Sequence, residues 1–311
     1  MRTYISIIIL SFNVKDLVDQ TLNSLLQSIK YTKIKNPNLI FKTIVVDNNS
    51  SDGAYELIKA KHKWVHLIKN KQNLGFAHGN NVGVKYIQPK SKYVMFINND
   101  VVLQKDTLLT MYDFMEKTPD CGLATCKVDL WSGGIDIDSH RGFPTPWRAF
   151  CYFSGIEKLL GKKLPKIFGQ YHLLDKDFNK IHQIDACLGA FMIIPTSIGN
   201  KIGWWPKEYF LNGEDIDLCY QIKNILNKKI YFVPTTKIIH YKGASKGTKG
   251  QAGKHAKASS KTKNLTINSG INSMKIFYKK YYEQKYPKIL TKIIYFGIYL
   301  LHKKRLLTKK E

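Results

Sequence analysis

Cysteine is scarce in this sequence, and its placement argues against a disulfide framework. The five cysteines are an odd number and stand in apolar or helical surroundings. Cys121 and Cys126 could suggest a metal pair, but no second pair follows at ligand spacing, so buried thiols are expected. The N-terminus also lacks the order of charged, apolar and small residues that is typical of a signal peptide. We therefore expect a reducing, cytoplasmic setting.

Long apolar runs are missing as well. The longest is residues 293–301, whereas a helix that crosses a bilayer needs roughly 20 residues. No internal repeat of solenoid length is visible, which argues against a repeat architecture. With 311 residues, 44% of them hydrophobic, the chain can bury one large core, with or without an accessory segment.

Acidic residues are few, at 23 against 49 lysines and arginines, and the excess is uneven. Residues 242–311 contain 18 basic and two acidic residues, so they carry +16 of the formal charge of +26. This asymmetry favours an anionic partner for the C-terminal segment, either nucleic acid or a membrane surface with acidic lipids. A lysine bias on a solvated face is the alternative.

Short runs rich in isoleucine and valine alternate with amphipathic stretches, a pattern typical of an α/β sheet covered by helices on both faces. The expected strands are residues 4–10, 42–47, 65–69, 93–98 and 121–128, and the expected helices are residues 15–30, 53–62, 76–88 and 106–117. Ligands of such sheets bind beyond the carboxyl ends of the strands. Polar residues 47–50 and 98–100 directly follow two strands, so both clusters should point into one crevice.

The pattern loosens after about residue 130 and then resumes. Loop-rich stretches with aromatic residues are expected to build a surface over the crevice. They are followed by a strand-like run at 184–195, a helix at 212–226 with Asn212 as N-cap, and a last strand at 228–234. The expected divisions are a folded domain over residues 1–242, a mobile Gly/Lys/Ser-rich loop over 243–263, and a basic amphipathic helical segment over 264–311. That last segment could lie in a membrane interface or pack on the domain as an ordinary helix.

Seven motifs occur in order between residues 4 and 243. They are SIIILSFNVKDLVDQTLNSL, TIVVDNNSSDGA, NLGFAHGNN, MFINNDVVL, DACLGAFMI, NGEDIDLCYQI and IIHYKG. Together they resemble family 2 glycosyltransferases, in particular bacterial rhamnosyltransferase-like enzymes of polysaccharide biosynthesis. The resemblance implies the GT-A fold, a mixed and mainly parallel α/β sheet flanked by helices. It also implies inverting transfer from a dTDP- or UDP-sugar to a lipid-linked or glycan acceptor.

Sugar transfer needs a cation for the departing diphosphate and a base for the acceptor hydroxyl. Asp100 matches the last position of the family's DXD-like motif, and His240 matches a histidine after the last strand. The resemblance therefore assigns both to Mg²⁺ or Mn²⁺, with Lys242 expected over the diphosphate. Asn98 replaces the first acid of that motif, which leaves one carboxylate instead of two. An ordinary turn at residues 98–100 is the alternative.

Glu214 and Asp215 match the family's ED motif. The resemblance implies that Asp215, with Glu214 beside it, deprotonates the acceptor hydroxyl on the face opposite the leaving group. Acids in the first turn of a helix are also favoured by the helix dipole. Glu214, Asp215 and Asp217 could therefore be no more than residues at a helix start.

The resemblance also assigns contacts to the sugar donor. Asp47 and Asn48 fall where the family reads the nucleotide base and ribose, and glycines stand where a side chain would crowd nucleotide or sugar. Asn80 could face the donor or simply lie on a solvated helix face. The donor-binding candidates are Ser11, Asn13, Asp47, Asn48, Gly75, Asn80, Asn99 and Gly189.

Two other functions fit parts of the sequence. A nucleic-acid-binding module would explain the charge and the interleaved lysines and tyrosines of residues 275–286, but not the acids at strand ends. A sugar-phosphate nucleotidyltransferase would need a glycine-rich basic loop after the first strand, where residues 10–16 read LSFNVKD. We therefore expect an enzyme without a nucleic-acid partner, bound peripherally to the inner face of the cell membrane.

Overall fold

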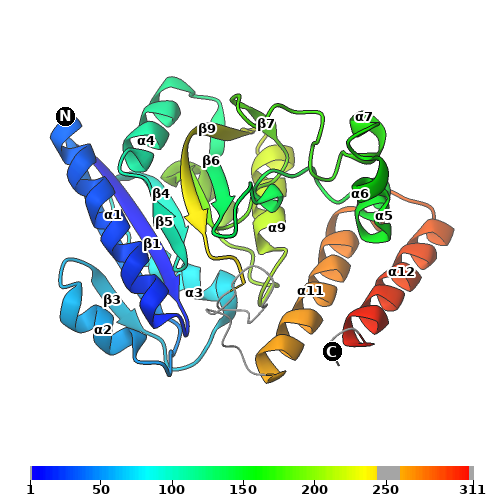
Figure 1. Ribbon diagram of the computed structural model, residues 1–311, viewed down its shortest axis with the longest axis horizontal. Coiled ribbons are helices and arrows are strands. Elements are labelled where there is room, and N and C mark those ends of the chain that lie inside the picture. Colours follow the sequence, from blue (N-terminus) through cyan, green and yellow to red (C-terminus); the bar gives the residue numbers. More distant parts are fainter. Residues whose placement is uncertain (1, 244–259, 308–311) are drawn as a thin grey trace.

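The computed structural model describes residues 2–243 and 260–307, which form a central sheet covered by helices, with a helical pair at one end (Figure 1). The strand order in the sheet is β3-β2-β1-β4-β8-β6-β9-β5, and β7 pairs with β9. The predicted mixed α/β sheet is confirmed. Two separate apolar clusters cover its two faces, so the sheet is buried on both sides.

The N-terminal half alternates parallel strands with helices, as predicted. Its elements are β1 (Thr3–Ser11), α1 (Lys15–Lys35), β2 (Leu39–Asp47), α2 (Ala54–Lys61), β3 (His66–Lys69), α3 (Gly75–Val84) and β4 (Ser91–Asn98). β1 lies between β2 and β4, with Ser11 in register with Asp47 and Leu10 in register with Asn98. The carboxyl ends of these three strands therefore meet at one edge of the sheet.

The second half contains more antiparallel pairing than the sequence suggested. Its elements are β5 (Val101–Leu103), α4 (Thr107–Lys117), β6 (Cys121–Leu130), the 3₁₀ turn η1 (Ile137–Ser139), α5 (Pro146–Ser154), α6 (Ile156–Leu160), α7 (Pro165–Phe168), β7 (His182–Ile184), β8 (Phe191–Pro195), α8 (Thr196–Ile202), α9 (Glu214–Tyr220), the π-helical turn η2 (Gln221–Ile225) and β9 (Lys229–His240). β8 runs antiparallel to both β4 and β6, whereas β6 and β9 are parallel.

Three predicted boundaries were wrong. The run 184–195 divides into β7 and β8, because the residues between them form a loop. The last strand continues past Pro234 to His240, since a register shift between Cys126 and Lys127 accommodates the proline in a bulge, where its missing N–H breaks no ladder bond. The N-cap of α9 is Gly213 and not Asn212. Its φ is 85°, in the left-handed region that most side chains avoid.

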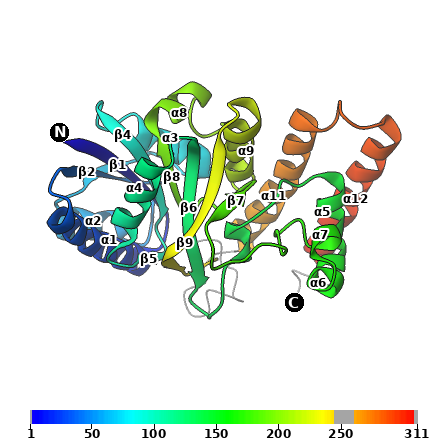
Figure 2. The ribbon, with the colours of Figure 1, turned by 90° about the horizontal axis from the view of Figure 1, so that it is seen from above.

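The C-terminal segment forms α11 (Ser260–Tyr281) and α12 (Lys288–Leu307). The end of the predicted loop 243–263 is therefore helical, and its residues 244–259 lie outside the described residues. α11 lies between α9 and α12 (Figure 2), and the Tyr281 ring stacks on Tyr220 at 4.0 Å. Of the two alternatives for this segment, packing on the folded domain is thus correct for α11. In residues 2–243 and 260–307, no helix combines the length and apolar character needed to cross a membrane.

Candidate active site

Two polar side chains lie side by side at the ends of β1 and β2. Ser11 and Asp47 are fully buried and in register. The Asp47 carboxylate accepts a hydrogen bond from the Ser50 backbone N–H through Oδ1 at 3.0 Å. Within the part of the chain that the structure describes, Asp47 Oδ2 and Ser11 Oγ have no hydrogen-bond partner. Buried polar atoms are costly to leave unpaired, so these two oxygens are suited to accept hydrogen bonds from a ligand.

Asn13 connects the loops that follow these two strands. Its backbone has a positive φ of 52°, and its side-chain Oδ1 accepts the Ser51 N–H at 2.8 Å. Its own N–H donates to Ser50 Oγ at 3.1 Å. Asp52 adds a second connection, because its carboxylate accepts the N–H groups of Lys15 at 2.7 Å and Ala54 at 3.1 Å. Asn13 therefore fixes the loop after β1 to the loop after β2.

Asn48 is buried, and its amide organises the loop before α3. Its Nδ2 donates to Asn73 Oδ1 at 2.8 Å, and its Oδ1 accepts from the Leu74 N–H at 3.0 Å. Gly75 follows with φ +76°, and a Cβ there would lie 2.3 Å from the Phe210 carbonyl oxygen. The close approach that requires glycine at this position is therefore to Phe210, which the sequence could not reveal.

Asn80 and Gly189 both contact Phe76 on α3. The Asn80 amide donates to the Phe76 carbonyl at 3.0 Å, and a Cβ on Gly189 would lie 3.0 Å from Phe76 Cζ. The glycine in this loop thus makes room for an aromatic ring of the protein. Asn99 is buried in the turn between β4 and β5, directly before Asp100. The predicted donor candidates therefore line the loops around the strand ends, and several have structural bonds there.

Asp100 and His240 are adjacent because β5 pairs antiparallel with the end of β9, with Val101 opposite His240. The distance from His240 Nε2 to Asp100 Oδ1 is 3.3 Å, and both side chains are buried. On its other side, His240 Nδ1 lies 3.4 Å from Asp136 Oδ2. The two residues assigned to a metal thus form a buried ion pair extended by a second carboxylate.

Two acids of this cluster were missed in the sequence. Asp136 is buried beside His240 and accepts from Lys242 Nζ at 2.6 Å, and Asp138 also binds Lys242. Lys242, expected over a diphosphate, is therefore paired with these two carboxylates. The pair of acids two residues apart in a glycine-rich loop was a visible signal, but nothing local indicated that the loop returns to the end of β9.

The protonation states follow from these contacts. Burial alone would lower the pKa of His240, but the carboxylates of Asp100 and Asp136 outweigh burial and raise it to about 9. Burial would likewise raise the pKa of Asp136, but the hydrogen bond from His240 and the Lys242 charge hold it below its usual value. At neutral pH His240 is therefore an imidazolium and Asp136 a carboxylate.

A divalent cation would find two ligands here after displacing a proton from His240, because only the neutral imidazole binds a metal. A carboxylate oxygen and an imidazole nitrogen face each other in Asp100 and His240, a donor pair that suits Mn²⁺ and, through the oxygen, Mg²⁺. Over residues 2–243 and 260–307, no group of three or more His, Cys, Asp or Glu side chains is arranged to hold a metal ion. The remaining ligands would have to come from water and a diphosphate.

The candidate base Asp215 is held by a buried arginine that was also missed in the sequence. Arg141 Nη2 donates to Asp215 Oδ2 at 2.7 Å, and the Ile216 N–H donates to Asp215 Oδ1 at 2.8 Å. The same Nη2 lies 3.3 Å from the Cys187 carbonyl oxygen. Burial would lower the pKa of Arg141, but the nearby charges of Asp215 and Asp138 outweigh burial and raise it above its ordinary value.

The three acids at the start of α9 have different surroundings. Glu214 is buried in the first turn beside Asp215. Asp217 is fully buried and accepts the hydroxyls of Tyr209 at 2.9 Å and Tyr281 at 2.7 Å, and it pairs with Lys280 Nζ at 3.0 Å. Asp217 therefore anchors α11, which leaves Asp215 and Glu214 as the candidates for chemistry.

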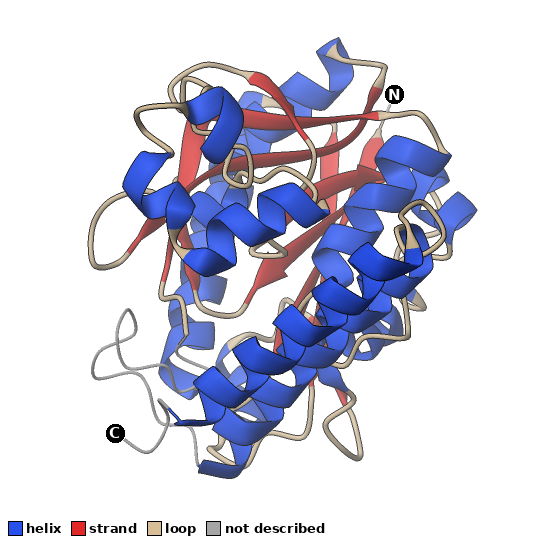
Figure 3. Ribbon diagram, turned by 90° about the vertical axis from the view of Figure 1, so that its right-hand side faces the viewer, coloured by secondary structure: helices blue, strands red, loops and turns tan. Residues whose placement is uncertain are grey.

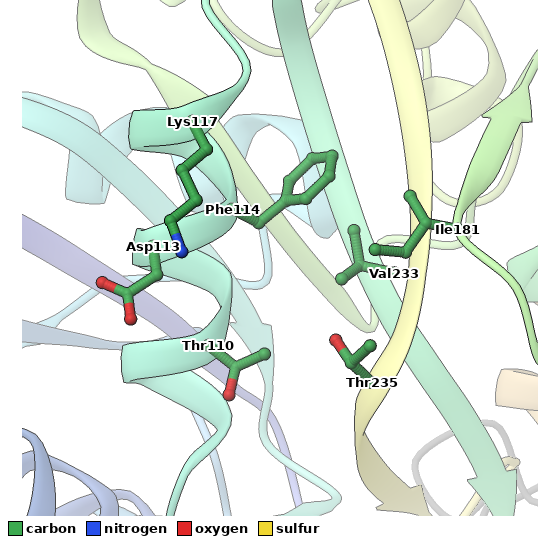
Figure 4. A pocket seen from close by; sticks show the side chains of 7 residues that line it. All are labelled: Thr110, Asp113, Phe114, Lys117, Ile181, Val233 and Thr235. Atoms are coloured by element: carbon green, nitrogen blue, oxygen red, sulfur yellow. The ribbon is translucent and has the colours of Figure 1, made fainter.

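Arg141 links the two parts of the site electrostatically. It pairs with Asp215, and the charge of Asp138 also raises its pKa; Asp138 in turn shares Lys242 with Asp136. Asp100, His240 and Asp215, which come from three distant parts of the sequence, thus belong to one network of charges that is partly exposed at Asp138 and Lys242. A separate depression between α4 and β9 contains none of these residues (Figure 4). It is lined by Thr110, Asp113, Phe114, Lys117, Ile181, Val233 and Thr235.

The chain is similar to known glycosyltransferases in sequence and in structure. It is 26% identical over 218 residues to the rhamnosyltransferase WbbL of Escherichia coli (strain K12). This alignment covers 64% of this chain and 78% of WbbL. The mannosyltransferase PcManGT from Pyrobaculum calidifontis, solved with GDP-Man and Mn²⁺, superposes with a TM-score of 0.54 at 13% identity, covering all of this chain and 89% of that one. GalNAc-T7, solved with UDP, GalNAc and Mn²⁺, superposes with a TM-score of 0.53 at 13% identity. The superposition covers 77% of this chain and 44% of that one.

These structural likenesses show the GT-A fold, as the sequence motifs predicted. A sequence model of the family described as glycosyl transferase family 2 matches residues 6–181, more than half of the chain, and the chain therefore belongs to that family.

Proposed function

We propose that this nucleotide-sugar glycosyltransferase is metal-dependent and inverts the anomeric centre. The observation that supports this most directly is that Asp215 and the Asp100–His240 pair are two buried ion pairs coupled electrostatically through Arg141, Asp138 and Lys242. In this proposal Asp215 accepts the proton of the acceptor hydroxyl, with Glu214 beside it. Arg141 holds one oxygen of Asp215 and so fixes the orientation of the carboxylate.

The donor would bind at the edge formed by the ends of β1, β2 and β4. Ser11 Oγ and Asp47 Oδ2 would take up polar groups of the nucleotide, and the loops held by Asn13, Asn48 and Gly75 would shape its surroundings. Asn80, Asn99 and Gly189 would complete the wall near the sugar. Asp100 and His240 would hold the divalent cation, which supplies positive charge for the departing diphosphate.

We propose rhamnose as the sugar and a dTDP- or UDP-sugar as the donor, because the similar protein WbbL is named a rhamnosyltransferase. The acceptor would be a lipid-linked or glycan intermediate of polysaccharide synthesis. The enzyme would then act at the cytoplasmic face of the membrane. The five cysteines agree with a reducing compartment, because each of them is free and buried.

A base substitution tests the proposed mechanism. With Mn²⁺ or Mg²⁺ and a panel of nucleotide sugars, donor binding is followed by thermal shift, and transfer is followed by donor consumption. Asp215→Asn should keep donor affinity within about twofold and lower transfer by roughly 10²–10⁴-fold. Asp177→Asn, in an exposed pair with Lys180, is the matched control and should transfer normally. Unchanged transfer by Asp215→Asn would overturn the assignment, and tight salt-dependent binding of nucleic acid without donor binding would overturn the proposed function.

A further inference from the structure

The outer side of α12 carries an apolar stripe that no described residue covers. Ile289, Ile293, Phe296, Leu300 and Leu307 are exposed by 75%, 60%, 61%, 51% and 68%. Their spacing of three, four and seven residues places them on one face of the helix. The uninterrupted part of the stripe runs from Ile289 to Leu300, or about 17 Å at 1.5 Å per residue, and Lys303 separates it from Leu307 on the same face. Apolar side chains this exposed and this aligned are typical of an interaction surface.

The opposite side of α12 already has its packing partner. Ile294 and Tyr295 pack against the core cluster that includes α11. The Tyr278 and Thr291 hydroxyls are 3.0 Å apart, and the Tyr295 hydroxyl donates to Glu283 Oε1 at 3.1 Å. The stripe is therefore a second apolar side of the helix and is not needed to hold α12 on α11.

A second apolar surface lies beside it on α5, α6 and α7. Trp147, Phe150, Leu159, Leu164 and Ile167 are between 48% and 76% exposed. The Arg305 guanidinium lies 5.9 Å from the centre of the Phe153 ring on α5, so α5 contacts α12 on the side of the helix that faces away from the stripe. Figures 1 and 2 place α5, α6, α7 and α12 at the same end of the molecule, and Figure 3 looks onto that end. We call these two surfaces together the outer face.

Charges around the outer face have one sign. Residues 146–168 and 288–307 contain a single acid, Glu157, which is buried and paired with His172 Nδ1 at 2.7 Å. The exposed cations of these two segments are Lys158, Lys162, Lys163, Lys166, Lys288, Lys292, Lys303 and Lys304. The outer face is thus an apolar and aromatic centre with a rim of lysines. Its own two segments expose no carboxylate, whereas Asp175 lies beside α7 and accepts the Gln170 amide at 3.0 Å.

We propose that the outer face binds an anionic phospholipid bilayer, with α12 lying in the plane of the interface. Its stripe would enter the boundary between head groups and acyl chains, the lysines would contact acidic head groups, and Trp147 would lie at the interface, where tryptophan is favoured. A rim with both signs of charge would suit a protein partner better, because paired charges give register between two proteins. The single sign on this rim therefore favours a bilayer.

The position of the outer face connects it to the active site. The segment that carries α5, α6 and α7 departs just after Arg141 and returns at Tyr171, whose carbonyl accepts the Gly142 N–H at 2.9 Å. A bilayer on the outer face would therefore lie on the side of the site where Arg141 holds Asp215. A bilayer in this position would present a lipid-carried acceptor to the base Asp215. This use of the outer face depends on the proposed function, whereas lipid binding itself does not.

Vesicle binding tests the proposal without any sugar substrate. The full chain is sedimented with vesicles of phosphatidylcholine containing phosphatidylglycerol and with vesicles of phosphatidylcholine alone. Wild type should bind the anionic vesicles at least about tenfold more strongly, and added salt should weaken this binding. The double variants Ile293→Ser/Phe296→Ser and Phe150→Ser/Leu159→Ser should each lose at least about tenfold in partition. Lys292→Glu/Lys303→Glu should lose the preference for anionic lipid.

Matched controls are available on α1, at the opposite end of the molecule (Figure 1). Ile34 is 77% exposed and Lys35 is exposed, so Ile34→Ser and Lys35→Glu remove the same groups from a different surface and should bind vesicles like wild type. Donor binding should stay unchanged in every variant, which separates lipid binding from the chemistry. The proposal is overturned if wild type ignores anionic vesicles. It is also overturned if the α12 variants bind anionic vesicles normally. The same holds if the α12 variants abolish self-association, measured by sedimentation velocity, without changing lipid binding.

Discussion

Arg141 Nη2 lies 2.7 Å from Asp215 Oδ2, and the two side chains form a buried ion pair at the start of α9. Since the Ile216 N–H holds the other oxygen, the carboxylate is fixed at both ends. A base held this rigidly has little freedom to adapt to a displaced acceptor, so its geometry depends on the arginine.

Replacing Arg141 should therefore impair transfer more than donor binding. We expect Arg141→Gln to lower kcat by about 100-fold, with the donor KM within a few-fold of wild type. The variant should also lose about 3–5 kcal/mol of stability, because Asp215 is left as a buried unpaired charge. Arg148→Gln is the control, since Asp185 keeps its 2.6 Å contact with Lys223 when Arg148 is removed. Equal kcat values for Arg141→Gln and Arg148→Gln would contradict the role given to Arg141.

Asp217 should contribute to stability and not to chemistry directly. It has no exposed surface and receives hydrogen bonds from two tyrosines and Lys280. Asp217→Asn weakens the charge-assisted hydrogen bonds from the two tyrosines, while Lys280 keeps Glu208 as a partner at 3.2 Å, so we expect a loss of about 1.5–3 kcal/mol in urea denaturation. The exposed control Asp177→Asn should change stability by less than about 1 kcal/mol. A small effect for Asp217→Asn would show that α11 does not depend on this anchor.

Gly75 and Gly203 allow backbone strain to be separated from steric overlap. Their φ angles are +76° and +73°, but a Cβ on Gly75 would lie 2.3 Å from the Phe210 carbonyl, whereas one on Gly203 would meet nothing within 4 Å. Gly203→Ala should therefore cost only the left-handed backbone penalty, about 1–2 kcal/mol. Gly75→Ala should cost clearly more, measured as the difference between the two unfolding curves. Equal costs would mean that the Phe210 contact relaxes freely.

His240 should make stability depend on pH. Its pKa in the folded protein is about 9, against 6.5 as the ordinary value, so the protonated form favours folding. The contribution is fully present below pH 6.5 and is lost as pH rises through 9. With a metal chelator present, wild type should exceed His240→Gln by roughly 3 kcal/mol more at pH 6 than at pH 9.5. Parallel pH curves for the two proteins would contradict this linkage.

Much of the fold could be predicted because apolar patterns are local. The isoleucine run of β1 and the polar residues after β2 and β4 indicated buried parallel strands with their polar ends at one edge, and the structure has this arrangement. The course of β9 was not predictable in the same way, because Pro234 normally ends a strand. Its tolerance depends on a bulge against β6, which is a property of the partner strand.

Prediction of the site was limited by contacts that are distant in sequence. The motifs identified Asp100, His240 and Asp215 one by one, but Asp136 reaches His240 across 104 residues and Arg141 reaches Asp215 across 74. Asn48 illustrates a second limit. Its sequence position favoured ligand contact, yet its amide is bonded to the loop before α3, and only the folded chain shows which polar groups are already satisfied.

The anchoring of α9 by the tail also has a consequence for synthesis. Asp217 receives hydrogen bonds from Lys280 and Tyr281, and these residues emerge from the ribosome some 63 positions later. Until then, the nascent helix that carries Asp215 has a charge without its partner. The surroundings of the helix that carries Asp215 are therefore complete only once α11 has been synthesised.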